Sequence, residues 1–205
     1  MLLDVEESQL VLVDYQERLM PAMFESATVL DNAHRLARMA RLLEVPVWGT
    51  EQNPAKLGPN PAAIREACRK TLSKMHFSAV ADGLADWLRP PARPAGGNAR
   101  SLPKHLQKPA APSQPERGTI VVAGCEAHVC LMQTALGLRR AGLGVFVLAS
   151  ACASRRPEDK ALALARLAQA GARLVNPEML AFEWLGHCAG PAFKPVLSRV
   201  KARGA

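Results

Sequence analysis

The sequence has few aromatic residues, only 4% of 205, although its formal net charge is +8. Much of the positive charge lies between Arg89 and Arg117, where six basic residues stand against one acidic residue. This stretch is rich in proline and contains no Phe, Tyr or Trp. Surfaces that bind single-stranded nucleic acid usually combine positive charge with stacking aromatic side chains. We therefore expect no nucleic-acid partner, and interpret residues 89–117 as an insertion that covers a pocket, forms an oligomer contact or hangs free.

Long apolar runs are also absent. None approaches the roughly 20 residues that a membrane-spanning helix needs, and the strongest run, residues 119–123, has the length of a strand. The first eight residues include Asp4, Glu6 and Glu7, which argues against a secretory signal. We expect a cytoplasmic protein with no membrane partner.

The cysteines form neither a CxxC pair nor a Cys/His pattern typical of zinc sites. Their number is odd and their spacing irregular, so a disulfide framework is not predicted either. Four of the five are interpreted as small buried apolar residues. The five are Cys68, Cys125, Cys130, Cys152 and Cys188.

The sequence does contain a regular alternation of strand and helix patterns, in a chain that is long enough for one domain spanning residues 1–205. Strands that alternate with helices predict an α/β fold, with a mainly parallel sheet covered on both faces. The expected strands are 9–13, 45–49, 72–78, 119–123, 143–149 and 172–175. The expected helices are 27–44, 61–70, 82–88, 128–141, 157–170, 178–185 and 192–201.

Ligands of such sheets bind beyond the carboxyl ends of the strands, which selects Asp14, Lys74 and Cys130. Cys130 is expected in the first turn of a helix, where free N–H groups and the helix dipole favour a thiolate. Each residue also has a simpler interpretation: Asp14 as a turn cap, Lys74 as a surface lysine and Cys130 as a packed core cysteine.

The context of these three residues resembles the isochorismatase-like cysteine hydrolase superfamily, and most closely its compact, metal-free YcaC-like and isochorismatase-domain-containing branch. The resemblance covers nearly the whole chain except the insertion. The matching segments are 12–19 (LVDYQERL), 50–52 (TEQ) with Pro54 and 57–58, 74–78 (KMHFS), 124–130 (GCEAHVC), 133–136 (QTAL), 154–155 and 183–185.

The resemblance implies a Rossmann-like three-layer sandwich with a six-stranded sheet in the order 3-2-1-4-5-6. It also implies a catalytic triad of Asp14, Lys74 and Cys130, and a cis peptide between Cys125 and Glu126. The backbone amides of Glu126 and Cys130 would form the oxyanion hole. Relatives usually assemble, so a homo-oligomer is expected.

The implied reaction is hydrolysis of a small amide, carbamoyl or related C–N substrate through a thioester on Cys130. The loop at residues 51–56 lacks the histidines that hold a metal in nicotinamidases, so no metal and no cofactor is expected. Isochorismatases that cleave a vinyl ether commonly lack the cysteine, which makes that activity an alternative here. A catalytically silent oligomeric binding or scaffold protein is another.

Several residues near the triad have less defined roles. Gln16, Gln52, Phe77 and His128 are candidate pocket-lining residues, and His128 is expected to point away from the thiol. Cys125 is interpreted as a volume-conserving replacement of Val or Ile, with a redox partner of Cys130 as the alternative. A nucleotide-binding interpretation fails because residues 14–17 (DYQE) stand where a glycine-rich phosphate turn should follow the first strand.

Overall fold

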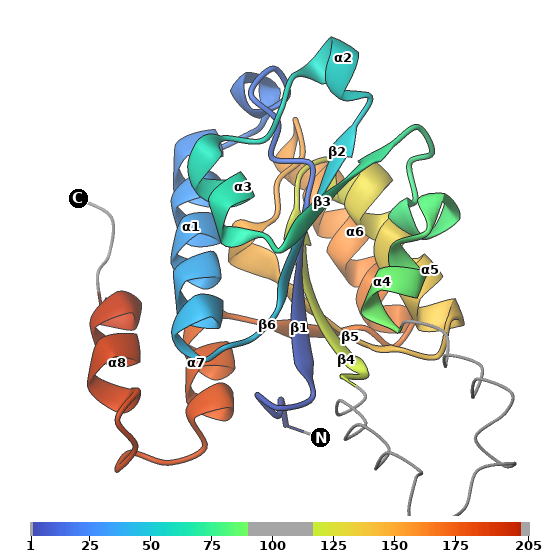
Figure 1. Cartoon of the computed structure of the whole chain (residues 1–205). Coiled ribbons are helices and arrows are strands. Elements are labelled where there is room, and N and C mark those ends of the chain that lie inside the picture. Colours follow the sequence, from blue (N-terminus) through green and yellow to red (C-terminus); the bar gives the residue numbers. More distant parts are fainter. Residues whose placement is uncertain (1, 90–116, 202–205) are drawn as a thin grey trace, which may run out of the picture.

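The computed structural model describes residues 2–89 and 117–201. Of the predicted insertion it therefore describes only the first and last residues, Arg89 and Arg117, and the rest lies outside the described residues. Its centre is a six-stranded sheet with the order β3-β2-β1-β4-β5-β6, in which every pairing is parallel (Figure 1). This confirms the predicted fold class and strand order. The strands are β1 (Ser8–Val13), β2 (Val47–Gln52), β3 (Lys70–Lys74), β4 (Thr119–Gly124), β5 (Gly144–Leu148) and β6 (Arg173–Val175).

Helices cover both faces of this sheet (Figure 1). On one side lie α1 (Ser26–Leu42), α3 (Ala62–Ala67), α7 (Pro177–Leu185) and α8 (Phe193–Lys201). On the other lie α4 (Leu84–Leu88), α5 (Met132–Arg140) and α6 (Pro157–Gln169). The short α2 (Pro54–Leu57) follows β2 beyond the carboxyl edge of the sheet. The layers are those of a three-layer sandwich.

The apolar pattern of the chain explains these layers. All residues of β1 and β4 are buried, as expected for central strands of a parallel sheet that has helices on both faces. In α1 the buried residues Val29, Ala33, Leu36 and Ala40 recur every three or four positions, which gives the helix one apolar face. Within the described ranges, no helix combines the length and apolar character that spanning a membrane requires.

Two predicted strands are shifted in the structure. The second covers Val47–Gln52 instead of 45–49, because its pairing with β1 continues to Thr50 and its pairing with β3 continues to Gln52, opposite Lys74. The third covers Lys70–Lys74 instead of 72–78. It is an edge strand with only its last residue fully buried, so its apolar signal is weak. The helix predicted from residue 128 begins as a π-helical turn, η5 (Ala127–Leu131), before α5.

Gly124, the last residue of β4, pairs with Val13 at the end of β1. A Cβ atom at this position would overlap the Val13 carbonyl oxygen, which is backbone and has little room to move. We expect Gly124→Ala to lower the free energy of unfolding by about 1–3 kcal/mol, as overpacking of a core does. Urea denaturation measures this.

Gly144→Ala is the matched control. A Cβ atom there would have its nearest contact at 3.6 Å, from Thr119 Oγ1, an ordinary van der Waals distance. Its effect should stay within about 0.5 kcal/mol. Equal losses in the two variants would contradict the close approach at Gly124.

Candidate active site

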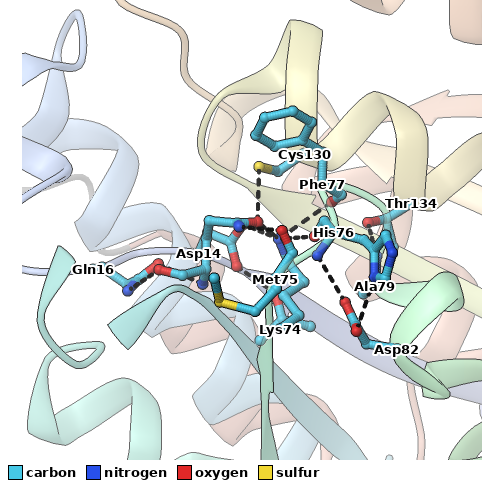
Figure 2. Close-up of polar contacts among 12 residues, drawn as sticks. Asp14, Gln16, Lys74, Met75, His76, Phe77, Ala79, Asp82, Cys130 and Thr134 are labelled. Atoms are coloured by element: carbon cyan, nitrogen blue, oxygen red, sulfur yellow. Dashed lines mark hydrogen bonds and ion pairs between the residues drawn. The ribbon is translucent and has the colours of Figure 1, made fainter. Parts of the chain in front are cut away.

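The three residues selected from the sequence meet at the carboxyl edge of the sheet. Asp14 follows β1, Lys74 ends β3, and Cys130 lies in η5 after β4. Figure 2 shows the side chains of Asp14, Lys74 and Cys130 gathered around one small region. Lys74 Nζ is 2.8 Å from Asp14 Oδ2, and both side chains have no exposed surface. The surface-lysine interpretation of Lys74 is therefore wrong.

The Asp14 carboxylate is held by its neighbours on β2. Thr50 Oγ1 donates a hydrogen bond of 2.6 Å to Asp14 Oδ1, and the Asp14 N–H donates to the Thr50 carbonyl at 3.2 Å. Asp14 has a left-handed backbone with φ of 55°, a conformation that Asp tolerates better than most residues. Among the described residues Oδ2 accepts no hydrogen bond beyond the ion pair with Lys74, so this oxygen has capacity to take a proton.

The Lys74 ammonium has three further acceptors around it. Gln52 Oε1 accepts from Nζ at 2.7 Å, and the carbonyls of Phe77 and His76 lie at 3.2 Å and 3.4 Å. The chain after β3 therefore wraps around the ammonium that ends the strand (Figure 2). Because a buried ammonium without partners is very costly, these four acceptors explain how the charge is tolerated.

The protonation state expected of Cys130 is wrong. Its thiol is 4% exposed, and burial raises the pKa of Cys130 to about 12. The Asp14 carboxylate also raises this pKa, while the Lys74 ammonium lowers it. A thiolate is not favoured at this helix start, because the rise in pKa from removing the sulfur from water is larger than the fall from the nearby ammonium and N–H groups. A pKa this high favours the neutral thiol of Cys130, close to both Asp14 and Lys74.

The predicted cis peptide between Cys125 and Glu126 is also wrong. The described residues contain no cis peptide bond, and the chain turns at this point through Glu126, which has φ of 50°. Hydrogen bonds fix the turn on both sides: Cys125 N–H donates to the Val13 carbonyl at 2.9 Å, and Ala127 N–H to the Ala153 carbonyl at 2.7 Å. The chain therefore turns here at a left-handed residue and not at a cis bond.

The candidate pocket-lining residues have different positions. Gln16 is fully buried, and its amide binds the backbone of Gln52 in both directions, with Nε2 to the carbonyl at 2.9 Å and Oε1 from the N–H at 2.7 Å. Gln52 is half-buried, with Oε1 4.0 Å from Cys130 Sγ. Phe77 is 54% exposed, and its carbonyl accepts from Lys74 Nζ. Gln16 thus supports the end of β2, whereas Gln52 lies next to the Cys130 sulfur and Phe77 contacts Lys74 through its backbone.

His128 belongs to a neighbouring polar cluster. Its Nδ1 lies 3.0 Å from Ser154 Oγ and 3.5 Å from Glu126 Oε2, and Arg155 Nε lies 3.0 Å from Glu126 Oε1. These contacts hold η5 against the segment after β5, which favours a structural role for His128 over the candidate role in lining the pocket.

Cys125 packs in the core with its Sγ 3.2 Å from Met20 Sδ. Burial raises the pKa of Cys125 well above its ordinary value, and all five cysteines are free. These observations favour the interpretation of Cys125 as a packing residue. In the part of the chain that the structure describes, no group of three or more His, Cys, Asp or Glu residues is placed to hold a metal ion.

Two contacts of the site were missed at the sequence level. Thr50 supports Asp14, and Gln52 contacts the Lys74 ammonium. The rule that selected Asp14 could have found them, because both lie at the carboxyl end of β2, next to β1 and β3.

Comparison with known proteins gives consistent likenesses. The isochorismatase domain profile matches residues 106–178. Isochorismatase domain-containing protein 2 of Homo sapiens is 34% identical over 194 residues, which cover 95% of this chain and 83% of the relative. Protein 2A of Mus musculus is 32% identical over 196 residues, covering 96% and 84%.

Among solved structures, the MAR1 ribonuclease from Caenorhabditis elegans has a TM-score of 0.82 at 25% identity, covering 100% of this chain and 95% of that chain. The YcaC gene product of Escherichia coli, described as an octameric hydrolase of unknown specificity, has a TM-score of 0.78 at 19% identity, covering 97% and 90%. With relatives above 30% identity matched over almost its whole length, the chain belongs to the isochorismatase domain family.

Proposed function

We propose that this protein is a cysteine hydrolase that cleaves a small amide, carbamoyl or related C–N substrate through a thioester on Cys130. Membership of the isochorismatase-like hydrolases supports hydrolysis as the reaction class. The observation that carries the proposal is the fully buried Asp14–Lys74 ion pair, which lies beside a cysteine thiol at the carboxyl edge of the sheet.

The first half of the reaction forms the thioester. Asp14 Oδ2 takes the proton of the Cys130 thiol as Sγ attacks the carbonyl carbon of the substrate. The carbonyl π electrons move to oxygen, and the backbone N–H groups of Glu126 and Cys130 are the proposed donors to this oxyanion. When the tetrahedral intermediate collapses, the C–N bond breaks and the protonated Asp14 gives its proton to the departing amine or ammonia.

The second half hydrolyses the thioester and releases the acid product derived from the substrate. The Asp14 carboxylate, again free, takes a proton from water as the water oxygen attacks the thioester carbon. Collapse of this intermediate breaks the C–S bond, and the proton on Asp14 returns to sulfur. Throughout both halves the Lys74 ammonium keeps its charge and offsets the negative charge that passes between Asp14 and Cys130.

The high pKa of the thiol sets the timing of the first step. Since burial holds the pKa of Cys130 at about 12, the thiolate is scarce near neutral pH before substrate arrives. Proton transfer to Asp14 therefore accompanies the attack on carbon. The low exposure of Cys130, at 4%, favours a small substrate over a polymer.

The residues of the site favour a cysteine hydrolase over the two alternative functions. A vinyl-ether isochorismatase has no need of a nucleophilic sulfur, so the position of Cys130 beside the ion pair favours acyl transfer. A silent binding protein has no need to keep two buried charges in contact with a thiol. A homo-oligomer, as expected from the sequence, remains part of this proposal.

The test is a screen of small amides, ureides and carbamoyl compounds, with ammonia or amine release as the readout. We expect at least one class to be hydrolysed, and mass spectrometry of acid-quenched turnover to find the acyl group on the peptide that contains Cys130. Hydrolysis without any acyl-enzyme at Cys130, under conditions where release of the first product precedes the second, would contradict the covalent route.

A further inference from the structure

Gln52 contacts both the Lys74 ammonium and the Cys130 thiol. It is the last residue of β2, the strand between β1, which leads to Asp14, and β3, which ends at Lys74. Its Oε1 lies 2.7 Å from Lys74 Nζ and 4.0 Å from Cys130 Sγ. One oxygen therefore contacts both the ammonium and the sulfur.

The orientation of this amide is fixed by its other contacts. Gln52 Nε2 donates to the Met75 carbonyl at 2.9 Å, so the nitrogen points at an acceptor and the oxygen at a donor. A flip of the amide would place two acceptors against each other at Met75 and two donors against each other at Lys74. The backbone of Gln52 is held by Gln16. The oxygen is thus kept toward Cys130.

An oxygen in this place favours a protonated sulfur. The Cys130 thiol donates toward Gln52 Oε1, although the contact is long at 4.0 Å. A thiolate has no proton to donate and would face the lone pairs of this oxygen. The amide dipole therefore opposes ionisation of the thiol.

Gln52 also accepts a hydrogen bond from an N–H group of Lys74 that could otherwise donate to a thiolate at Cys130. The Lys74 ammonium has three N–H groups, and four acceptors surround it: Asp14 Oδ2, Gln52 Oε1 and the carbonyls of His76 and Phe77. The two short contacts, with Asp14 Oδ2 at 2.8 Å and Gln52 Oε1 at 2.7 Å, take one N–H group each, and the longer contacts with the two carbonyls, at 3.2 Å and 3.4 Å, share the third. If the acceptor at Gln52 were removed, one N–H would be free to turn to the sulfur.

We propose that Gln52 is a positioning residue that keeps one N–H of the Lys74 ammonium from the sulfur and so holds the resting Cys130 in its thiol form. This inference rests on the proposed function, because it assigns Gln52 a role at the same nucleophile. A neutral thiol reacts slowly with electrophiles and oxidants, and it becomes a nucleophile when Asp14 takes its proton during attack on the substrate.

The charged groups around Cys130 are limited in the described residues. Asp14 from β1 and Lys74 from β3 act on the thiol directly. On its own segment, Glu126 is paired with Arg155, and His128 contacts Glu126 and Ser154. The Gln52 variants below leave all of these groups in place.

The experiment measures alkylation of Cys130 by iodoacetamide, a neutral reagent, from pH 6.5 to 9.5. Mass spectrometry of the Cys130 peptide separates this cysteine from the other four. In Gln52→Leu we expect the rate at pH 7.5 to rise about threefold or more, since a fall of one unit in pKa gives ~10-fold more thiolate of somewhat lower nucleophilicity. In Gln52→Glu we expect a slower rate than in the unchanged protein, because the new carboxylate opposes the thiolate.

Two further variants separate this effect from a loosened fold. Gln133→Leu makes the same chemical change at an exposed position of α5 and should leave the rate unchanged. Measured against Lys74→Met alone, the double variant Gln52→Leu with Lys74→Met should show no gain, because the ammonium that stabilises the thiolate is gone from both. A gain that persists without Lys74 overturns the proposal, as does a Gln52→Leu rate equal to or below that of the unchanged protein.

Alkylation requires no turnover, so this result is independent of the covalent route. The alkylation rates can contradict the positioning role of Gln52. The substrate screen and the turnover of Cys130→Ala can contradict the hydrolase function.

Discussion

Replacement of Cys130 by alanine is expected to lower the turnover of a substrate found in the screen by at least ~10³-fold, because it removes the atom that forms the covalent intermediate. The remaining activity would come from substrate binding and from the backbone N–H groups of the proposed oxyanion hole. Ammonia release under initial-rate conditions measures the loss. The stability cost should be about 1 kcal/mol, typical of removing one small core group.

Cys188→Ala is the matched control for this variant. Cys188 is also a free cysteine, but it is exposed and lies outside the carboxyl edge of the sheet. Its variant should keep the rate of the unchanged protein. If Cys130→Ala retained more than about a tenth of the rate, the proposed thioester on Cys130 would be excluded.

Replacement of Lys74 by methionine is expected to lower the free energy of unfolding by about 3–5 kcal/mol, because it leaves the carboxylate of Asp14 buried without its counter-charge. The 2.8 Å separation and the complete burial of both side chains make this pair costly to break from one side. Urea denaturation near neutral pH, followed by circular dichroism, gives the change.

The origin of this cost is tested by removing both charges. In the double variant Asp14→Leu with Lys74→Met no buried charge is left, so the double variant should be more stable than Lys74→Met alone. Lys70→Met, on the same strand, is the control. Lys70 is exposed and lies 4.0 Å from the Trp87 ring centroid, so its loss should cost about 0.5–1 kcal/mol. Equal costs at Lys70 and Lys74 would show that the ion pair carries no special stability.

The sheet could be predicted from the sequence where burial is complete. The apolar runs of β1 and β4 located these strands to within one residue, because both faces of a central strand are covered and most of its side chains are apolar. The edge strand β3 was misplaced because only Lys74 in it is fully buried. An edge strand carries little of the core pattern on which such predictions depend.

The residues of the candidate site could be predicted from the sequence, but the protonation state of Cys130 and the conformation of the turn at Glu126 could not. Asp14, Lys74 and Cys130 follow from the rule that parallel strands bring their carboxyl ends to one edge. The thiol form of Cys130 depends on how tightly the surrounding chain covers the sulfur, which no local pattern reveals. The turn at Glu126 likewise depends on hydrogen bonds to Val13 and Ala153, residues distant in sequence.

Gln9 ties together the two points where the chain leaves and rejoins the described structure. Its Nε2 donates to the Leu88 carbonyl and to the Arg117 carbonyl, both at 2.9 Å. Gln9 lies near the start of β1, five residues before Asp14, so this junction is about 16 Å from the reactive edge at about 3.3 Å per strand residue. The two described ends of the predicted insertion are therefore anchored to each other at the amino end of β1, the end of the strand opposite to the one that leads to Asp14.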